Sequence, residues 1–365
     1  MSELIKTALF TQHEALGAKM VEYSGFTMPV SYSGLSDEHL SVRTDVGMFD
    51  VSHMGEFSVD GPDALAFIQQ ITTNDVNTLV DGKIQYSCMP NGNGGIVDDL
   101  LVYRFTEDSY LLVVNAGNKG KDWVWVNEKA SEGGFNVDIK DNSNLWALIA
   151  LQGPNASAAL KPLVDEGGID PEKLKYYTFT KGEIMGADCI ISATGYTGSG
   201  GFELYIPNSS AGKIWEALID GGVKPCGLGA RDTLRMEMGY CLYGNDINET
   251  TNPIEAGLGW ITKFTNAFID SDLLQQIKTD GPTRRLVGLK ILKRGIPRKD
   301  YEVVSSEGEV VGVITSGTMS PSLGIGIGMA YIDSSFSKKG TELAVRIRNK
   351  DITAEVVRFP FLKLA

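Results

Sequence analysis

The chain has 365 residues, 42% of them hydrophobic and 22% charged, with a formal net charge of −13 and a pI near 4.8. Its length exceeds the size at which one hydrophobic core stops growing, so we expect several domains of an ordinary globular enzyme. The acidic balance excludes unspecific nucleic-acid binding, because phosphate contacts need concentrated Lys and Arg. The start of the chain shows no signal-peptide pattern, and no run of about 18 apolar residues could span a membrane. We therefore expect a cytoplasmic protein with no membrane partner.

Cysteine and histidine spacing argues against a metal site or a disulfide framework. The four cysteines lack any CxxC spacing and lie in apolar surroundings, so we expect buried free thiols. None of the three histidines has a partner at helical ligand spacing. The residues concerned are Cys88, Cys189, Cys226, Cys241, His13, His39 and His53. The sequence predicts no bound metal.

In chain order, the first 280 residues alternate between helical and strand patterns. Helices are predicted at 7–17, from Ser36, and at 63–71, 119–130, 155–164 and 211–220. Strands are predicted at 51–60, 86–89, 96–105, 110–115, 145–151, 177–180, 189–193 and 201–206, with turn-rich stretches at 25–34 and 91–95. This order indicates an α+β fold.

After Gly281-Pro282 the pattern consists of strands only, separated by Gly, Asn-Lys and Ser turns. These strands are predicted at 285–292, 301–305, 310–316, 325–332, 341–347 and 352–357, after a linker at 279–283. The C-terminal part is therefore predicted to be a small β-barrel or jelly roll.

Two adjacent carboxylates, Asp98 and Asp99, directly follow the glycine-rich turn at 91–95 and precede an apolar strand. Neighbours in a strand face opposite sides, so only one of the two can face a given pocket. A carboxylate at the edge of a buried region needs a hydrogen-bonding partner or a role. An Asp pair that merely closes the turn is the simpler alternative.

A second glycine-dense loop, 194–201, leads into a strand in which Glu203 is flanked by apolar residues. A glutamate there could accept two hydrogen bonds from a flat, guanidine-like edge, or it could simply face solvent. Arg231, in a helix that follows Gly227-Leu-Gly, could clamp a carboxylate or hold Glu203, or belong to a structural charge network. No phosphate loop, dinucleotide fingerprint or nucleophile elbow occurs. The residues alone support a multidomain enzyme with a glycine-lined polar pocket.

Eight segments, in order and over nearly the whole chain, resemble the glycine cleavage T-protein family. They are Arg43-Thr-Asp-Val-Gly-Met-Phe-Asp-Val-Ser-His-Met-Gly, Thr73-Asn-Asp, Gly94-Gly-Ile-Val-Asp-Asp-Leu, Gln152-Gly-Pro, Thr194-Gly-Tyr-Thr-Gly, Gly227-Leu-Gly-Ala-Arg-Asp, Leu242-Tyr-Gly-Asn-Asp and Thr315-Ser-Gly. The resemblance implies a three-domain cloverleaf around a central folate-binding channel, with two α+β domains and a C-terminal β-barrel. On this basis the domains are expected at 1–50 plus 140–280, at 51–139 with the catalytic aspartate, and at 281–365.

The family reaction moves the carbon of an aminomethyl group from the lipoyl arm of the H-protein to tetrahydrofolate, giving 5,10-methylenetetrahydrofolate and ammonia. By resemblance, Asp99 is the catalytic carboxylate that orients the attacking nitrogen and stabilises the developing positive charge. Glu203 is expected to bind the pterin ring. The remaining cofactor-binding residues implied are Met54, Tyr86, Asn115, Tyr196, Arg231 and Tyr240.

The implied partner is the lipoylated H-protein, and we expect a monomer. Basic residues of the last domain, such as Arg284, Arg285, Lys293, Arg294 and Arg298, are candidates for docking it. The chain ends without the arginine-containing tail frequent in the family, so Lys363 would have to substitute for it.

Two rival functions share the scaffold or the ligand. One is a folate-dependent demethylase acting on a small methylated compound such as dimethylsulfoniopropionate, or a relative of the folate-binding halves of dimethylglycine and sarcosine oxidising enzymes. The other is a noncatalytic folate-binding protein, whose Lys-Gly-Cys-Tyr-x-Gly-Gln signature is absent here. The intact Asp-Asp-Leu and Tyr-Gly-Asn-Asp segments favour the aminomethyltransferase.

Overall fold

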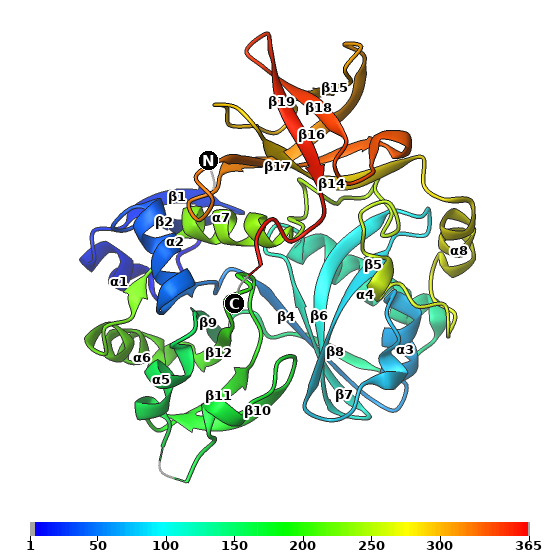
Figure 1. The fold of residues 1–365 in the computed structure, drawn as a ribbon. Coiled ribbons are helices and arrows are strands. Elements are labelled where there is room, and N and C mark those ends of the chain that lie inside the picture. The colour runs from blue at the N-terminus through cyan, green and yellow to red at the C-terminus, as the bar shows by residue number, and fades with distance from the viewer. Residues whose placement is uncertain (1–3, 166, 364–365) are drawn as a thin grey trace. The chain divides into compact units, whose positions relative to one another are not determined.

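The computed structural model of the protein describes residues 4–165 and 167–363. The chain forms two compact units: the first comprises residues 1–68, 76–86 and 100–232, and the second comprises 69–75, 87–99 and 233–365. Figure 1 follows the chain through its helices and strands. None of the helices in the described ranges combines the length and the apolar character needed to cross a membrane. The expected partition into three domains stays a prediction.

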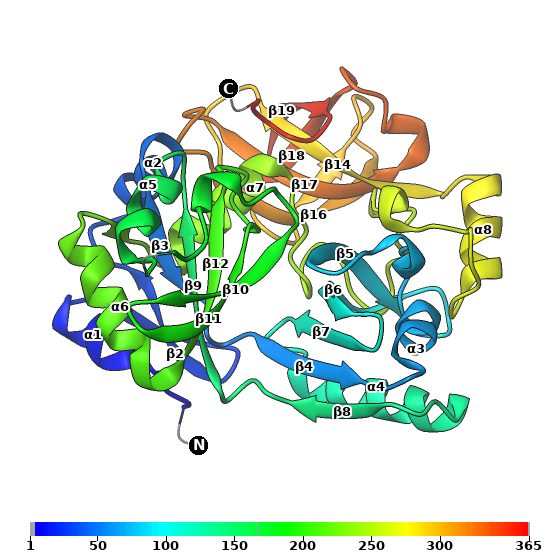
Figure 2. The same cartoon turned by 90° about the horizontal axis from the view of Figure 1, so that it is seen from below.

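A five-stranded sheet contains the segment with the two adjacent aspartates. Its strand order is β5-β6-β7-β4-β8. Helix α4 lies against it (Figure 2), where Trp123 meets Phe57 of β4 edge to face at 5.2 Å between ring centres. The elements of this region are β4 (Gly55–Asp60), α3 (Ala64–Ile71), η1 (Val76–Thr78), β5 (Lys83–Pro90), β6 (Ile96–Thr106), β7 (Ser109–Val114), α4 (Lys119–Gly133) and β8 (Asp138–Asp141).

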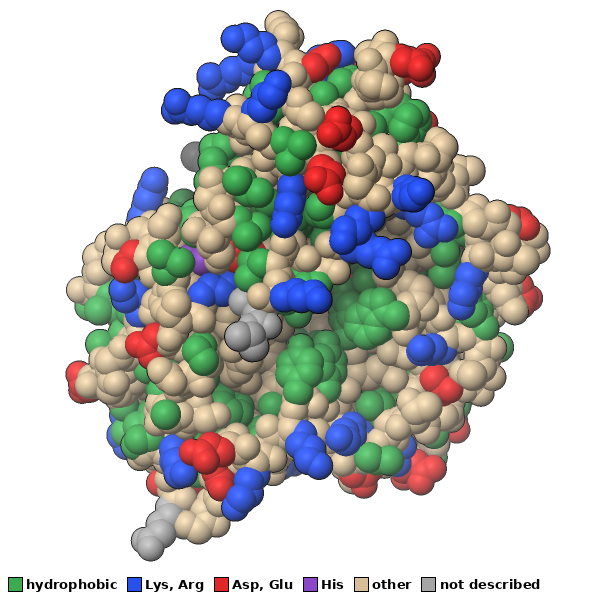
Figure 3. Space-filling view, in the orientation of Figure 1, with side chains coloured by type: hydrophobic (Ala, Val, Ile, Leu, Met, Phe, Trp, Pro, Cys, Tyr) green, Lys and Arg blue, Asp and Glu red, His purple; other side chains and the backbone are tan. Residues whose placement is uncertain are grey.

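The strand-only pattern after Gly281 forms a closed barrel, as predicted, with the order β14-β17-β16-β15-β18-β19. Alternate residues of the strands, such as Leu289, Val303 and Val345, fill its interior. Lys and Arg side chains, with Asp and Glu among them, project from the barrel part of the face shown in Figure 3. The strands are β14 (Arg284–Ile291), β15 (Glu302–Val304), β16 (Val310–Met319), β17 (Gly326–Asp333), β18 (Glu342–Ile347) and β19 (Lys350–Val357), with η4 (Gly259–Ile261) and α8 (Ser271–Asp280) before them and η5 (Ser334–Phe336) after β17.

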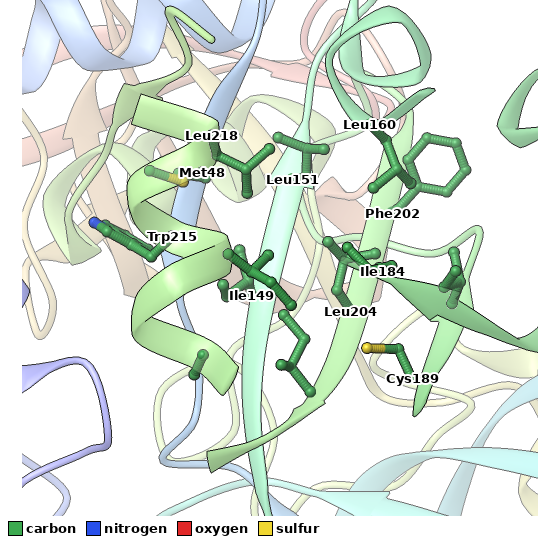
Figure 4. Close-up of a cluster of buried hydrophobic side chains, with 14 of the residues drawn as sticks. Met48, Ile149, Leu151, Leu160, Ile184, Cys189, Phe202, Leu204, Trp215 and Leu218 are labelled. Atoms are coloured by element: carbon green, nitrogen blue, oxygen red, sulfur yellow. The ribbon is translucent and has the colours of Figure 1, made fainter. Parts of the chain in front are cut away.

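A six-stranded sheet in the first unit, with the order β10-β11-β12-β9-β3-β13, carries Glu203. Helix α6 covers one side because its buried residues, Ala211, Ile214, Trp215 and Leu218, recur at helical spacing. Leu218 lies beside Leu151 of β9, with Phe202 and Leu204 of β12 next along the sheet (Figure 4). Each large apolar side chain buried there contributes about 1.5–3 kcal/mol. This core makes β12 a rigid base for Glu203.

The remaining elements are the six strands of this sheet and the helices and strands that accompany them along the chain. They are α1 (Phe10–Ala15), β1 (Lys19–Tyr23), β2 (Phe26–Ser31), α2 (Leu35–Thr44), β3 (Gly47–Asp50), β9 (Trp146–Gln152), α5 (Ala156–Leu160), η2 (Lys161–Leu163), η3 (Pro171–Lys173), β10 (Phe179–Ile184), β11 (Ala187–Ser192), β12 (Gly201–Pro207), α6 (Asn208–Asp220), β13 (Lys224–Pro225) and α7 (Leu228–Met238). The α+β prediction is confirmed.

Several local predictions were wrong at their boundaries. The stretch 25–34 contains β2, which pairs with β1 across a turn at Ser24-Gly25, where both residues have positive φ. Helix α2 begins at Leu35, one residue before the predicted start, and follows Gly34, whose φ of 123° a residue with a Cβ avoids. Residues 51–54 form a turn, and the strand begins at Gly55. Helix α8 extends to Asp280, so the connection to the barrel is shorter than the predicted linker.

Candidate functional site

The glycine-dense loop between β11 and β12 is fastened by two side chains from distant parts of the first unit. Gln152 Nε2 donates to the Thr194 carbonyl at 3.0 Å, and its Oε1 accepts from Thr197 Oγ1 at 2.8 Å. Arg43 Nη1 donates to the Thr197 carbonyl at 2.5 Å. A Cβ on Gly195 would lie 1.9 Å from Gln152 Oε1, so only glycine fits. Three of the segments singled out in the sequence therefore meet here.

Glu203 lies at the start of β12 and is 8% exposed. Thr194 Oγ1 donates to its Oε2 at 2.5 Å. Burial raises the pKa of Glu203, while the hydrogen bond from Thr194 and the positive charge of Arg231 act in the opposite direction. The carboxylate is therefore shielded from water, accepts a hydrogen bond from Thr194 at one oxygen, and interacts electrostatically with Arg231.

Arg231, from the first turns of α7, lies with its Cζ 4.8 Å from the centre of the Tyr196 ring. Its Nη1 is buried and has no hydrogen-bond partner among the described residues. His53, next to Met54 in the turn before β4, is buried, and its pKa falls to about 4 because of burial and, to a lesser degree, Arg231. The structure thus brings Glu203, Arg231 and Tyr196 together, and His53 is a neutral neighbour of Arg231.

Tyr86 and Asn115 belong to the five-stranded sheet and are both half-buried. Tyr86 lies in β5, and Asn115 directly follows β7, where its carbonyl accepts from the Asn118 amide at 2.9 Å at the entry to α4. Their contact with a folate, like that of Met54, stays a prediction.

In β6, Asp98 is fully buried and Asp99 is partly exposed, as the alternation of a strand requires. Burial, and then the charge of Asp99, raises the pKa of the Cys88 thiol. Burial, then Asp246 and then Asp99 raise the pKa of Cys241. Asp99 therefore stands at the border of an apolar region that keeps two neighbouring thiols protonated. All four cysteines are free and buried, as predicted.

The turn that precedes this aspartate pair is locked within the second unit. Asp270 Oδ2 accepts from the amides of Gly92 and Gly94 at 2.8 and 2.9 Å. A Cβ on Gly95 would lie 1.8 Å from the Glu249 carbonyl oxygen, so the two backbone segments can approach only because residue 95 is glycine. The turn therefore gives Asp99 a fixed backbone position.

A buried ion pair joins two further segments singled out in the sequence. Arg235 Nη1 lies 2.6 Å from Asp246 Oδ2, and the two side chains are 1% and 0% exposed. Thr315 Oγ1 donates to Asp246 Oδ1 at 2.5 Å, and Arg235 Nη2 donates to Ser316 Oγ at 2.9 Å. Arg235 Nη1 also donates to the Tyr240 carbonyl at 2.9 Å. Tyr240, predicted to bind folate, is therefore held by this pair through its backbone.

Sequence reasoning did not assign the side chains that fasten these segments. Arg43 and Gln152 stood inside resembling segments, so a signal was present for them, whereas Asp270 lies outside all eight and carried none. Within residues 4–165 and 167–363, no three His, Cys, Asp or Glu side chains are grouped so that they could hold a metal ion.

The fold consists of an α+β region followed by a closed barrel, and glycine-rich turns and loops precede the strands that carry the candidate acidic residues. Each of these two parts matches a known protein family. Residues 9–266 match the family described as the GCVT N-terminal domain, and residues 284–363 match the glycine cleavage T-protein C-terminal barrel domain. The chain belongs to the glycine cleavage T-protein family.

Curated relatives and a solved structure agree with this assignment. Aminomethyltransferases of Flavobacterium psychrophilum and Bacteroides thetaiotaomicron are 52% and 54% identical to this chain, covering 98% of it and 99% and 100% of their own lengths. The crystal structure of glycine cleavage system aminomethyltransferase T from Bartonella henselae superposes with a TM-score of 0.92 at 35% identity, over 99% of each chain. The resemblance inferred from eight segments is confirmed over nearly the full length.

Proposed function

We propose that this chain is a tetrahydrofolate-dependent aminomethyltransferase of the glycine cleavage system. It transfers the methylene carbon of the aminomethyl group on the lipoyl arm of the H-protein to tetrahydrofolate, giving 5,10-methylenetetrahydrofolate and ammonia. Family membership and the aminomethyltransferase names of relatives at 51–54% identity support this activity. They do not favour the folate-dependent demethylase.

Asp99 is the proposed catalytic carboxylate. The observation that carries this role is the contrast within the pair: Asp98 is fully buried, whereas Asp99 is partly exposed on a strand whose preceding turn is locked by Asp270. A carboxylate fixed at the border of an apolar region stabilises nearby positive charge more than a mobile, solvated one does. When the carbon–sulfur bond to the lipoyl arm breaks, the carbon gains iminium character, and Asp99 would stabilise that charge and orient the attacking folate nitrogen.

Glu203 is the proposed ligand of the pterin ring. The ring's amino-pyrimidine edge offers two N–H donors, and an ionised carboxylate is an acceptor-only group that matches them. Arg231 and Tyr196, which stack at 4.8 Å beside Glu203, would complete this part of the folate site. Met54, Tyr86, Asn115 and Tyr240 are assigned to the same folate by the family resemblance.

The proposed partner is the lipoylated H-protein of the glycine cleavage system, and a basic surface on this chain would suit an acidic face of that partner. Lys and Arg side chains project from the barrel (Figure 3), and Arg285, Lys293 and Arg294 are among the candidates that would meet it.

The decisive assay measures methylenetetrahydrofolate formation from aminomethylated H-protein and tetrahydrofolate. We expect Asp99→Asn to lower kcat at least about tenfold while tetrahydrofolate still binds, because the variant removes transition-state stabilisation. Asp220→Asn, the same change at an exposed position at the end of α6, is the matched control and should leave the rate unchanged. If the wild-type protein binds tetrahydrofolate but forms no methylenetetrahydrofolate from the loaded H-protein, the proposed aminomethyltransferase activity is wrong. Demethylation of dimethylsulfoniopropionate would then be the activity to measure.

A further inference from the structure

Glu203 is the end of a continuous chain of buried hydroxyl groups. Tyr205 OH donates to Tyr103 OH at 3.0 Å, and Tyr103 OH lies 2.9 Å from Ser192 Oγ. Ser192 Oγ lies 2.6 Å from Thr194 Oγ1, which donates to Glu203 Oε2 at 2.5 Å. All five side chains belong to the first unit, and the exposed fraction of none exceeds 8%. They come from β6, β11, β12 and the loop between β11 and β12.

The donors in this chain can point in only one direction while Glu203 is ionised. Each hydroxyl has a single proton, and Thr194 uses its proton on the carboxylate. Ser192 must therefore donate to Thr194, and Tyr103 must donate to Ser192. Tyr205 completes the series by donating to Tyr103, which is the direction observed. Hydrogen bonds aligned in this way polarise one another and strengthen the last bond, the one to the charge.

The charged and titratable groups around the carboxylate are few. Arg231 faces Glu203 from α7, Tyr103 faces it from β6, and Tyr205 lies on its own strand. Beyond them, Glu56 of β4 lies near Tyr205; it is buried, and burial raises its pKa well above that of an ordinary glutamate. The raised pKa favours the neutral form of Glu56, which adds no negative charge beside Tyr205.

We propose that Tyr103, Ser192 and Thr194 are positioning residues that hold Glu203 as a carboxylate through Oε2 and leave Oε1 to accept the pterin N–H donors. No described residue donates a hydrogen bond to Oε1. The inference rests on the proposed role of Glu203 in binding tetrahydrofolate. It adds the means by which a deeply buried glutamate keeps the acceptor-only form that the ligand requires.

The pH dependence of binding follows with a definite sign. The ionised form of Glu203 binds, so affinity falls as the pH drops through the pKa of Glu203. The hydroxyl chain opposes the effect of burial, so breaking it raises that pKa further. Each variant that breaks the chain of hydroxyl groups should therefore lose affinity for tetrahydrofolate at a higher pH than the wild type does.

The test measures the dissociation constant of tetrahydrofolate by calorimetry between about pH 5 and pH 8 under anaerobic conditions, with folding checked by circular dichroism. Glu203→Gln is measured first. Thr194→Val, which keeps the shape of threonine without its hydroxyl, should raise the Kd about tenfold, and Tyr103→Phe and Ser192→Ala severalfold. All three should shift the pH midpoint of binding upward. Thr194→Ser, which restores the hydroxyl, should recover both the affinity and the midpoint.

Tyr301 is a half-buried tyrosine of the barrel that takes no part in the chain of hydroxyl groups. Tyr301→Phe is therefore the control for loss of a hydroxyl, and it should change neither the Kd nor the pH midpoint of binding. Folded Thr194→Val and Ser192→Ala variants with the wild-type Kd and midpoint would overturn the inference. If Tyr103→Phe does not fold, those two variants decide. A Glu203→Gln variant that binds as tightly as the wild type would instead overturn the proposed role of Glu203 itself, so the two failures are distinguishable.

Discussion

Acidification from pH 7 to pH 5 should destabilise this protein through His53, and the cause lies in the surroundings of that ring. His53 is 3% exposed, meets Tyr23 edge to face at 5.4 Å and Phe26 at 6.4 Å, and has no hydrogen-bond partner at Nδ1 among the described residues. Burial lowers its pKa to about 4, with Arg231 adding to the effect and Asp50 opposing it. The ring therefore stays neutral in the folded state at both pH values.

The magnitude follows from linkage. In the unfolded chain a histidine titrates near a pKa of about 6.5, so on acidification the unfolded state takes up a proton that the folded state does not. The free energy of unfolding then falls between about pH 6.5 and pH 4. The difference of about 2.5 pKa units is worth about 3 kcal/mol in total, of which about 2 kcal/mol is lost between pH 7 and pH 5.

Urea unfolding followed by circular dichroism at pH 7 and pH 5 measures this loss. His53→Gln stays neutral at both pH values, so its loss of stability on acidification should be about 2 kcal/mol smaller than that of the wild type. Phe26→Leu removes part of the apolar wall but keeps the titrating group, so it should lower stability at both pH values and keep most of the wild-type difference. If His53→Gln and the wild type lose the same stability between the two pH values, the assignment of the acid sensitivity to His53 is wrong.

Three further predictions concern buried groups and backbone contacts. Burial raises the pKa of Glu56 well above the ordinary value, so its effect on stability has the opposite sign to that of His53. The folded state holds the proton more tightly than the unfolded state, so the contribution of Glu56 to stability falls as the pH rises. Glu56→Gln should remove that trend in the same urea experiment. Asp246→Asn should cost about 3–5 kcal/mol because it leaves Arg235 buried and uncompensated. The same change at Asp351, in an exposed pair with Arg346, should cost less than about 1 kcal/mol, and equal losses would contradict the argument. Gly95→Ala should lower the melting temperature, because its Cβ would overlap the Glu249 carbonyl. The control, Gly120→Ala in α4, has no atom within 4 Å of the added Cβ and should raise stability by up to about 1 kcal/mol. An unchanged melting temperature for Gly95→Ala would contradict the close approach of the two backbone segments.

Local patterns were sufficient where each residue's environment repeats along the chain. The six barrel strands were predicted in order because each is a short run rich in apolar residues between turn residues, even though β17 is buried on both faces and does not alternate. The β1–β2 hairpin was missed because Gly25 and Pro29 suggested a loop, whereas Pro29 is tolerated in a two-stranded sheet, where it pairs with a single neighbouring strand at Met20. The cytoplasmic location, the monomeric state and the role of Lys363 stay predictions.

The sequence by itself determined the fold class, the family and the candidates Asp99, Glu203 and Arg231, because these depend on periodicity and on short ordered segments. Only the tertiary structure decided which side chains control those candidates. Tyr103 and Thr194 are 91 residues apart in number but two links apart in the chain of hydroxyls that ends on Glu203. Contacts of this kind leave no local signal, because a hydroxyl in a strand has the same neighbours in sequence whether it faces water or a buried carboxylate.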